Sequence, residues 1–300
     1  MSDSAVTFSA EELARGAGGR WTDGRGTAVS GVFTDTRQDG SGRLFIALSG
    51  ENFDAHDFLP AAVSAGAAAL CVAESKLGRL PEPCPVPVLA VADPLWSYQG
   101  IARLHRRRFP ELTVAAVTGS VGKTSVKEML RAIFTAAAGA ERVLYTVGNT
   151  NNQVGVPQNL LRLQPQHRFA VIEMGTNHHG EIEPLSCCAL PQVALVNSIA
   201  PCHLEFLGSL EGIAREKSRI FSGLPADGTA VIPRSCPAVE VLAEAAAPFR
   251  LLRFGEGSGC AVEAHYCGGR LEGSSFELRF ADGERFEISW SLTGRHQAVD

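Results

Sequence analysis

The chain has 300 residues, with 27 Lys and Arg against 32 Asp and Glu, which gives a formal net charge of −5 at pH 7. At about 150 residues per domain, this length predicts two domains. The mild acidity argues against a nucleic-acid partner, and 45% hydrophobic with 20% charged residues is typical of globular proteins rather than disordered ones. The sequence has no apolar run of the roughly 18 to 20 residues that a membrane helix needs, and the N-terminus lacks the features of a secretory signal. We therefore expect a cytoplasmic protein without a membrane span.

Strand and helix signals alternate up to residue 110. The predicted elements in this part are strands at 43–48, 67–73 and 86–91 and a helix at 57–67. Asp93-Pro94 then opens a helix, and Arg106–Arg108 followed by Pro110 ends it; three arginines at a helix end are ordinarily solvated and complement the helix dipole. We place a first α/β domain with its linking helix at 1–110.

From residue 111 the pattern restarts as a parallel α/β unit. Continuous apolar runs predict strands at 112–117, 168–175 and 192–200, and apolar residues at helical spacing predict a helix at 124–139. After Pro233, strand-like runs at 260–266, 275–280 and 285–292 are separated by Gly268-Gly269 and Asp282-Gly283, which are hairpin turn signals. The predicted fold class is α/β, with a central parallel-sheet domain at 111–300 that carries a small antiparallel appendage.

The strand at 112–117 runs directly into Thr118-Gly119-Ser120-Val121-Gly122-Lys123-Thr124, and a helix follows. In such a loop the glycines let backbone N–H groups surround phosphate oxygens, the lysine reaches the β- and γ-phosphates, and the threonine hydroxyl binds Mg²⁺. Val117 stands where the longer G-x-x-x-x-G-K-[ST] pattern has glycine, so the match is to a shorter variant. This context predicts binding of a nucleoside triphosphate.

Lys217 lies on the apolar stripe of the segment Ser209–Phe221, with Ser209 as the expected N-cap. Two interpretations are open. The stem can pack while the ammonium reaches water or a carboxylate; alternatively, a desolvated amine loses its proton and reacts with an electrophile such as carbon dioxide.

Polar residues follow the next two predicted strands. Glu173 and His203 stand near strand ends, where ligand sites of parallel sheets form, and with Thr124 they are candidates to hold Mg²⁺. His203 alone is more typical of a loop hydrogen bond, since Mg²⁺ prefers oxygen. The asparagines of GNTNNQVGVP either form turn hydrogen bonds or reach a polar substrate.

Five segments carry a wider resemblance: TDTRQDGSGRLFIALSGENFDAHDF, VTGSVGKTSVKEML, GNTNNQVGVPQNLLRL, VIEMGTNHHGEI and NSIAPCHLEFLGSLEGIAREKSRIF. Read together, they resemble the Mur ligase family, the ATP-dependent amide-bond formers of peptidoglycan precursor synthesis. Ser120 and the GNTNNQVGVP string favour the branch that adds D-Ala-D-Ala to UDP-MurNAc-tripeptide through an acyl phosphate. The resemblance implies that 1–110 binds UDP-MurNAc and that 111–300 binds ATP; we expect a monomer.

The resemblance also implies residue roles. Catalysis would fall on Lys123, Lys217 and His203. ATP would be bound by Thr118, Gly119, Ser120, Val121, Gly122, Lys123, Thr124, Ser125 and Gln297. Two Mg²⁺ ions would be held by Thr124, Glu173, His203 and Lys217, the last carbamylated. The UDP-linked substrate would contact Thr36, Arg37, Asn52, His56, Asn151 and Asn152.

Two departures from the family pattern stand out. The family's C-terminal domain has not begun where this sequence stops, so we expect a truncated chain whose activity alone is open. The string G-x-H-N-x-x-N here reads GRHQAVD, with Gln297 in place of the first asparagine. Two alternatives remain: a related ligase of the diamino-acid-adding or folylpolyglutamate type, and a non-catalytic nucleotide- or UDP-sugar-binding module.

Overall fold

The computed structural model describes residues 6–50, 52–270 and 272–291, and these form two compact units. The first unit comprises Met1–Pro110 and Gln153–Pro165, and the second comprises Glu111–Asn152 and Gln166–Asp300. The segment 153–165 thus belongs to the first unit although it lies within the second in sequence. Among the described residues, no helix combines the length and apolar character needed to span a bilayer.

Within the described residues, the first unit is built on a five-stranded sheet with the strand order β1-β5-β4-β3-β2. Its strands are β1 (Arg20–Trp21), β2 (Val32–Phe33), β3 (Leu44–Ile46), β4 (Ala69–Ala73) and β5 (Val88–Val91). Its helices are α1 (Ala10–Ala17), α2 (Leu59–Ser64), α3 (Pro94–Arg106), α5 (Gly155–Leu160) and the 3-10 turns η1 (Thr22–Gly24), η2 (Ala55–Phe58) and η3 (Glu74–Arg79). β2 to β5 are parallel, and β1 runs antiparallel to β5.

Alternation along these buried strands produces a hydrophobic core on each face of the sheet. Leu44 and Ile46 of β3 pack with the core of α1 and α3, while Phe45 between them packs with the core of α2. The helix predicted from Asp93 is confirmed, and Asp93 caps α3 through hydrogen bonds from the N–H groups of Leu95 and Trp96. The prediction of a fully solvated helix end is wrong for Arg106, which is buried and donates to the Phe109 carbonyl oxygen.

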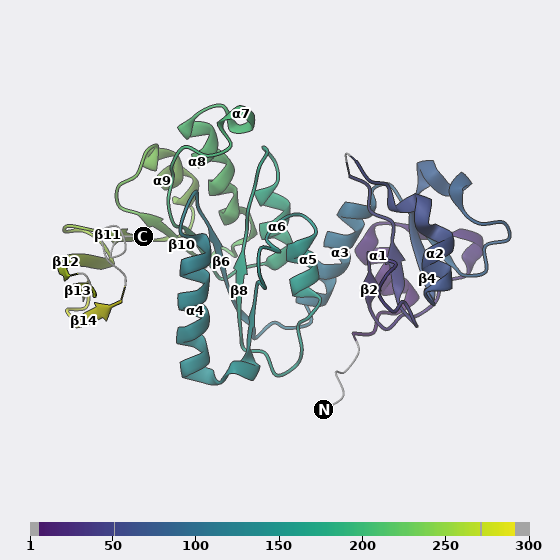
Figure 1. Cartoon of the computed structure of the whole chain (residues 1–300), viewed down its shortest axis with the longest axis horizontal. Helices are drawn as coiled ribbons and strands as arrows, with labels where there is room; N and C mark the ends of the chain where they lie inside the picture. Colours follow the sequence, from purple (N-terminus) through teal and green to yellow (C-terminus); the bar gives the residue numbers. More distant parts are fainter. Residues whose placement is uncertain (1–5, 51, 271, 292–300) are drawn as a thin grey trace. The chain divides into compact units, whose positions relative to one another are not determined.

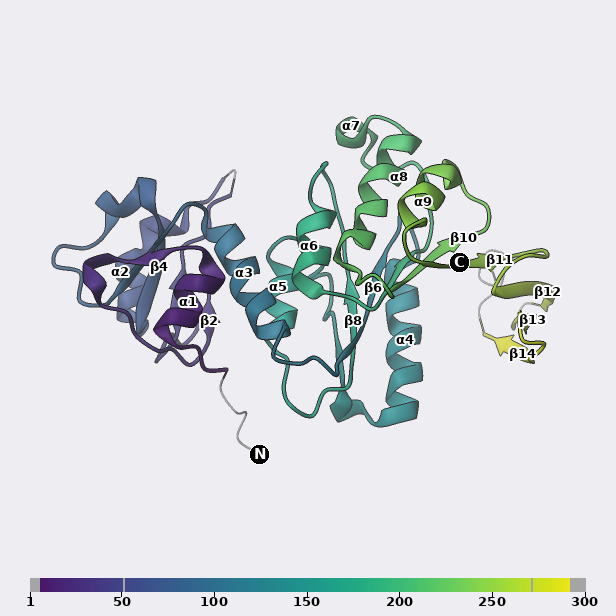
Figure 2. The same ribbon diagram turned by 180° about the vertical axis from the view of Figure 1, so that it is seen from behind.

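The second unit contains a nine-stranded sheet with the order β14-β13-β12-β11-β10-β9-β6-β8-β7 among the described residues. Its strands are β6 (Thr113–Thr118), β7 (Val143–Tyr145), β8 (Phe169–Glu173), β9 (Val193–Val196), β10 (Thr229–Pro233), β11 (Arg250–Gly255), β12 (Val262–Arg270), β13 (Gly273–Phe280) and β14 (Arg285–Trp290). Its helices are α4 (Lys123–Ala138), α6 (Ile182–Ala189), α7 (Leu204–Leu207), α8 (Leu210–Ser218), α9 (Val239–Ala246) and the turns η4 (Ala140–Arg142) and η5 (Arg219–Gly223). Figures 1 and 2 show α4 along one side of the sheet, from the front and from behind.

Strand order places the candidate site. β6 lies between β9 and β8, and all three run parallel, so their carboxyl ends meet at the point where the chain turns from one half of the sheet to the other. Ligands of open α/β sheets bind at such a point. The α/β class with a largely parallel central sheet is confirmed, as is the antiparallel appendage of β12, β13 and β14.

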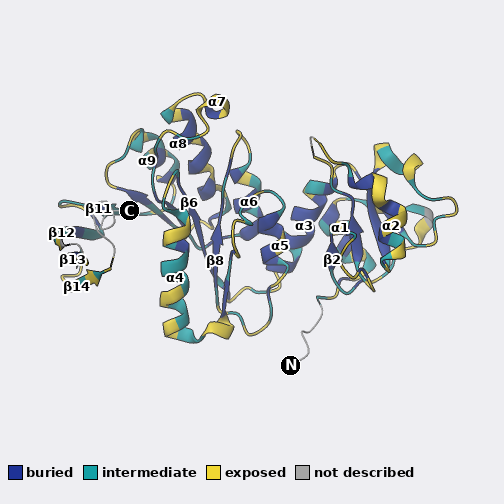
Figure 3. Ribbon diagram, in the orientation of Figure 1, coloured by how far each residue is buried: buried dark blue, intermediate teal, exposed yellow. Residues whose placement is uncertain are grey.

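Two details of the second unit differ from expectation. Gly268-Gly269 is not a hairpin turn but lies inside β12, where a bulge after Tyr266 uses the positive φ of Gly268 (129°). The helix predicted at 124–139 is confirmed as α4, but its apolar stripe is only partly covered among the described residues, since Ile133 is 60% exposed. Figure 3 shows the exposed positions along α4.

Candidate functional site

The loop between β6 and α4 has the backbone of a phosphate-binding loop. Gly122 takes a left-handed conformation (φ 77°, ψ −7°) at the N-cap of α4, which is why this position requires glycine. The N–H groups in the first turn of this 16-residue helix point out of its end. The loop therefore presents backbone donors and the positive end of a helix dipole at one point.

The segment after β9 braces this loop. Ser120 N–H donates to the Ser198 carbonyl oxygen (2.9 Å), and the Ser120 hydroxyl donates to the Ala200 carbonyl oxygen (2.9 Å). The Asn197 amide donates to the Val121 carbonyl oxygen (3.0 Å). Ser120, expected to bind ATP, thus has its side chain engaged in holding the loop's shape, and the bracing by Asn197 and Ser198 is a contribution that the sequence pattern did not reveal.

Lys123 is folded back on its own loop, with its ammonium donating to the Gly119 carbonyl oxygen at 2.8 Å. Thr118 is buried and donates its hydroxyl hydrogen to the Met174 carbonyl oxygen (2.7 Å), so this side chain joins β6 to the segment after β8. Thr124 and Ser125 are exposed at the start of α4. Thr124 and Ser125 are therefore accessible at the loop, whereas Thr118 is buried and supports the packing of β6.

Glu173, at the carboxyl end of β8, is the acidic centre of the site. The residue is 1% exposed, and its carboxylate accepts hydrogen bonds from the Thr124 hydroxyl (3.1 Å to Oε2) and from the Asn151 side-chain amide (2.8 Å to Oε1). Its backbone N–H donates to the Thr146 hydroxyl (3.0 Å). Asn151, predicted to contact substrate, therefore orients the carboxylate, and the structure brings Thr124 and Glu173 together as the metal prediction required.

Lys217 is 1% exposed on α8, and Ser209 caps this helix by accepting a hydrogen bond from Gly212 N–H (3.1 Å). Between described residues, the Lys217 amine forms no hydrogen bond or ion pair with a carboxylate, and the nearby charge of Glu216 acts on it only through space. Burial, and then the charge of Lys123, lowers the pKa of Lys217 to about 8. The Lys217 amine therefore loses its proton at a lower pH than an ordinary lysine does.

Glu216, the residue before Lys217, ties α8 to the segment after β8. Its carboxylate is 3% exposed and accepts three backbone hydrogen bonds, from the N–H groups of Gly180 (2.8 Å), Glu181 (3.0 Å) and Ile182 (2.9 Å). These groups form the start of α6, so the carboxylate satisfies orphan donors of that helix. No sequence motif indicates this role of Glu216, because its partners are backbone atoms.

The remaining predicted site residues of this unit are His203, Asn152 and Gln297. His203 has a left-handed backbone (φ 49°) before α7 and an exposed side chain, and no hydrogen bond or ion pair between described residues joins it to Glu173 or Lys217. The described residues contain no cluster of three or more His, Cys, Asp or Glu side chains suited to a metal. Asn152 is exposed, and Gln297 lies outside the described residues.

The first unit has a separate cavity of about 510 Å³ at the loop after β2. Its lining residues are Thr34, Asp35, Thr36, Arg37, Phe45, Phe53, Ala55 and Phe58. The exposed rings of Phe53 and Phe58 are stacked, with centroids 5.3 Å apart and planes at 17°. Arg37 holds Asp35 in an ion pair (2.6 Å), and hydrogen bonds from Arg37 lower the pKa of Asp35 to about 2. Asp35 is therefore ionised at neutral pH and pairs with Arg37 at the edge of the cavity.

Asn52 and His56, the two other substrate-binding residues predicted in this unit, do not line the cavity. His56 is 1% exposed, and both ring nitrogens are occupied: Nε2 accepts from Ala73 N–H (3.1 Å) and Nδ1 lies 2.7 Å from an Asp54 oxygen. His56 consequently has no nitrogen free for a ligand and instead fixes the loop that carries Phe53. Asn52 is exposed beside that loop.

Residues 117–299 match the Mur ligase middle domain. The chain belongs to the Mur ligase family. Over 209 residues it is 46% identical to the UDP-N-acetylmuramoyl-tripeptide--D-alanyl-D-alanine ligase of Escherichia coli strain K12, a match covering 70% of this chain and 44% of the relative. The ligase of the same name from Haemophilus influenzae is 40% identical over 89% of this chain and 57% of its own length. The chain thus spans about half the length of the curated relatives that it matches.

Solved structures of the family agree with this fold. A crystal structure of MurF from Acinetobacter baumannii superimposes with a TM-score of 0.88 at 32% identity, covering 98% of this chain and 63% of that one. MurF ligase from Thermotoga maritima in complex with ADP has a TM-score of 0.70 at 26% identity, covering 86% and 57%. A 2,6-diaminopimelate ligase of the family matches at 20% identity with a TM-score of 0.69, which shows the shared fold alone.

Proposed function

We propose that this chain provides the nucleotide- and precursor-binding units of an ATP-dependent ligase that joins D-Ala-D-Ala to UDP-MurNAc-tripeptide. The observation that carries the proposal is the Thr124–Glu173 hydrogen bond at the phosphate loop, together with a buried Lys217 on which the charge of the loop's Lys123 acts. The relatives with 40 to 46% identity are named as ligases of this specificity. The alternatives of another Mur-type substrate and of a non-catalytic module are decided by the experiments below.

ATP is the proposed ligand of the second unit. Its phosphates would lie against the N–H groups of the loop and the start of α4, and the Lys123 ammonium would leave the Gly119 carbonyl oxygen for the β- and γ-phosphates. Ser120 would act through the loop's conformation rather than through direct contact. A lysine placed at this point stabilises the negative charge that develops during phosphoryl transfer.

Mg²⁺ fits the donor set, because the Glu173 carboxylate and the Thr124 hydroxyl are adjacent oxygen donors of the kind that Mg²⁺ prefers. Bound there, the ion would neutralise phosphate charge and favour transfer of the γ-phosphoryl group. Asn151 would keep the carboxylate aimed at it. A second ion would use His203 and a carbamate on Lys217.

Carbamylation follows from the state of the Lys217 amine. The neutral nitrogen attacks the carbon of CO₂, an N–C bond forms while one C=O π pair moves to oxygen, and the nitrogen gives up one proton to solvent. The product carries a negative charge in place of a buried positive one, so it relieves the repulsion with Lys123 that contributes to the lowered pKa of Lys217. It also supplies oxygen ligands where the unmodified side chain supplies none.

In the first unit, the cavity beside Thr34–Arg37 is the proposed site for the uridine end of the precursor. Phe53 and Phe58 offer a stacking surface for a planar base, while Thr36 and Arg37 line the same cavity. His56 would support this site indirectly by fixing the loop through Asp54 and Ala73. Asn52 and Asn152 remain proposed contacts on their exposure and family position alone.

The proposed reaction has two steps. The terminal carboxylate of the tripeptide attacks the γ-phosphorus of ATP, so that ADP leaves and an acyl phosphate forms. The amine of D-Ala-D-Ala then attacks the acyl carbon, loses a proton and displaces inorganic phosphate. Activation is needed because an unmodified carboxylate is a poor acyl donor. We propose that the reaction takes place in the cytoplasm, in a monomer.

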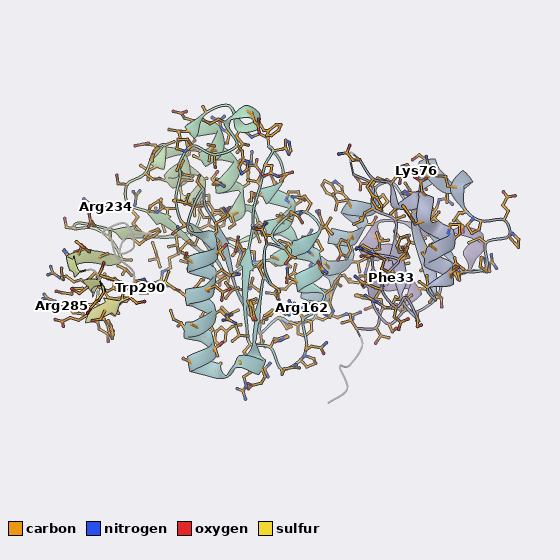
Figure 4. All side chains as sticks on the ribbon, viewed as in Figure 1. Phe33, Lys76, Arg162, Arg234, Arg285 and Trp290 are labelled. Carbon is orange, nitrogen blue, oxygen red and sulfur yellow. The ribbon has the colours of Figure 1, made fainter. Side chains whose placement is uncertain are left out.

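Calorimetric titration with MgATP tests the nucleotide site. Lys123→Ala should weaken binding by at least about 100-fold, since the loop loses its only proposed cationic phosphate contact. Lys76→Ala is the matched control: its ammonium binds Asp54 in the first unit, as Figure 4 locates it, and the variant should bind MgATP like the wild type. Equal affinity of wild type and Lys123→Ala would refute the phosphate-loop assignment.

An assay of amide formation tests specificity. Phosphate release should require both UDP-MurNAc-tripeptide and D-Ala-D-Ala, and Phe53→Ala should raise the KM for the precursor while leaving that for MgATP unchanged. Turnover with diaminopimelate or glutamate as the amine donor would support the alternative ligases. Binding of both nucleotides without any ligation would support the non-catalytic module.

A further inference from the structure

A second cavity of the first unit, of about 280 Å³, lies at the opposite end of the sheet from the Thr34–Arg37 loop. It is bounded by the start of β2 and β3, by Tyr98 of α3 and by the end of α5. The lining residues are Val6, Ser30, Gly31, Val32, Arg43, Tyr98, Gln158, Leu161 and Arg162. The function proposed above uses none of them.

The lining is cationic without a compensating acid. Arg43 and Arg162 both line the cavity, and no aspartate or glutamate does. Between described residues, neither guanidinium forms an ion pair: Arg43 donates to the carbonyl oxygens of Asp39 and Val32, and Arg162 donates to the side-chain oxygen of Asn159 (3.0 Å). Two like charges at one cavity repel each other, and an anion bound between them removes that repulsion.

Arg43 is held ready for such an anion. Its two carbonyl partners fix the terminal nitrogens, and its guanidinium lies over the Phe33 ring at 5.3 Å, so the side chain has little freedom left to lose on binding. Gly31 has no side chain to cover Nε of Arg43. A Cβ atom at this position would lie 3.7 Å from that nitrogen. Burial lowers the pKa of Arg43 but leaves it far above neutral, since arginine remains protonated in proteins.

The chemistry of the walls defines the ligand class. Two guanidinium groups can bind different oxygens of one phosphate, which has three terminal oxygens when esterified, whereas a carboxylate offers two. The cavity is larger than a bare phosphate, and Val6, Val32 and Leu161 give the remaining volume an apolar wall. We propose that this cavity binds a small phosphate monoester, with Arg43 and Arg162 clasping the phosphate. Figure 4 labels Phe33, on which Arg43 is stacked, and Arg162, which follows α5.

The test uses the chain carrying Lys123→Met, so that the phosphate loop does not contribute, titrated with glycerol 3-phosphate and with inorganic phosphate by calorimetry at low salt. One site is expected, with the ester bound more tightly than inorganic phosphate because of the apolar wall. Arg43→Met and Arg162→Met should each weaken binding at least tenfold. Arg79→Met is the control: that arginine pairs with Asp54 and Asp57, and its removal should leave affinity unchanged.

Gln158→Glu separates charge from folding, because Gln158 is exposed and the change is isosteric. A carboxylate at this rim position should weaken ester binding at least tenfold while the thermal unfolding midpoint stays unchanged. Absence of binding at millimolar ester, or equal binding by the arginine variants, Gln158→Glu and the parent, would overturn the proposal. Tighter binding of inorganic phosphate than of the ester would overturn the assignment to a monoester. Loss of MgATP binding in Lys123→Ala is an independent result, so the two proposals fail separately.

Discussion

Removing the Glu216 carboxylate should destabilise the second unit more than its position on a short helix suggests. The carboxylate is 3% exposed and accepts hydrogen bonds from three consecutive backbone N–H groups. Hydrogen bonds to charged groups contribute about 1.5–3 kcal/mol each, and they are not additive when they share one acceptor. In Glu216→Ala, water can replace the carboxylate at exposed Gly180, whereas the N–H of buried Ile182 is left without a partner. We therefore expect a loss of about 3 kcal/mol in the free energy of unfolding.

Glu216→Gln should fall between the wild type and the alanine variant. The amide oxygen can keep the bonds to Glu181 and Ile182, but the amide nitrogen then faces the N–H of Gly180, and the charge is lost. A cost of about 1–2 kcal/mol follows. Urea unfolding measures these differences, and amide exchange of residues 180–182 shows whether the loss is local. Glu183→Gln is the control on α6, since its half-exposed carboxylate pairs with Arg219 at 3.6 Å and should change stability by less than about 0.5 kcal/mol. Glu216→Ala unfolding within that margin of the wild type would refute the reasoning.

Three further outcomes are expected. Gly100→Ala should destabilise the first unit by about 1–3 kcal/mol in urea unfolding, because its Cβ would lie 2.1 Å from the Gly16 carbonyl oxygen, whereas Gly78→Ala, with open space around it, should not; equal stabilities would contradict this. Burial lowers the pKa of His105 to about 4. Between pH 6.5 and pH 4, this histidine is therefore protonated in the unfolded chain but neutral in the folded chain. Stability should fall by up to about 3 kcal/mol between pH 6.5 and pH 4, and less in His105→Gln; identical profiles would rule the histidine out. With ¹³C-bicarbonate, a carbamate signal should grow as pH approaches 8 and be missing in Lys217→Met, and a signal retained in that variant would exclude Lys217 as its source.

The sequence predicted the parts of the site that are encoded locally. A strand, a glycine loop and a helix are contiguous between residues 113 and 138, so their pattern was sufficient to place Lys123 and Thr124. The burial of Lys217 also followed from helical spacing, because Leu210 and Ile213 lie on the same stripe. Glu216 was beyond this reasoning, since its partners are backbone N–H groups more than 30 residues away in sequence.

Two fold details were missed for a related reason. Gly268-Gly269 has the composition of a turn, but pairing with β13 keeps it within a strand, and the glycines serve a bulge instead. The segment 153–165 has no boundary signal, yet α5 packs with α3 and its neighbours Val154 and Leu161 join the core of the first unit. In both cases a tertiary contact decides between local alternatives that the sequence leaves equal.

The arrangement of Lys123 and Lys217 has an energetic consequence for ligand binding. Holding a buried amine near a second ammonium costs the folded protein free energy, as the lowered pKa of Lys217 records. The Lys123 ammonium meanwhile donates a hydrogen bond to the Gly119 carbonyl oxygen of its own loop, and a neutral carbonyl is a weaker acceptor than a phosphate. Anionic phosphates, and a carbamate in place of the amine, would each remove part of this cost. In the free chain, the repulsion between Lys123 and Lys217 is therefore unfavourable at the site where the negative charge of the ligand is proposed to lie. Binding of a polyphosphate relieves this repulsion, whereas binding of a neutral ligand of the same shape does not.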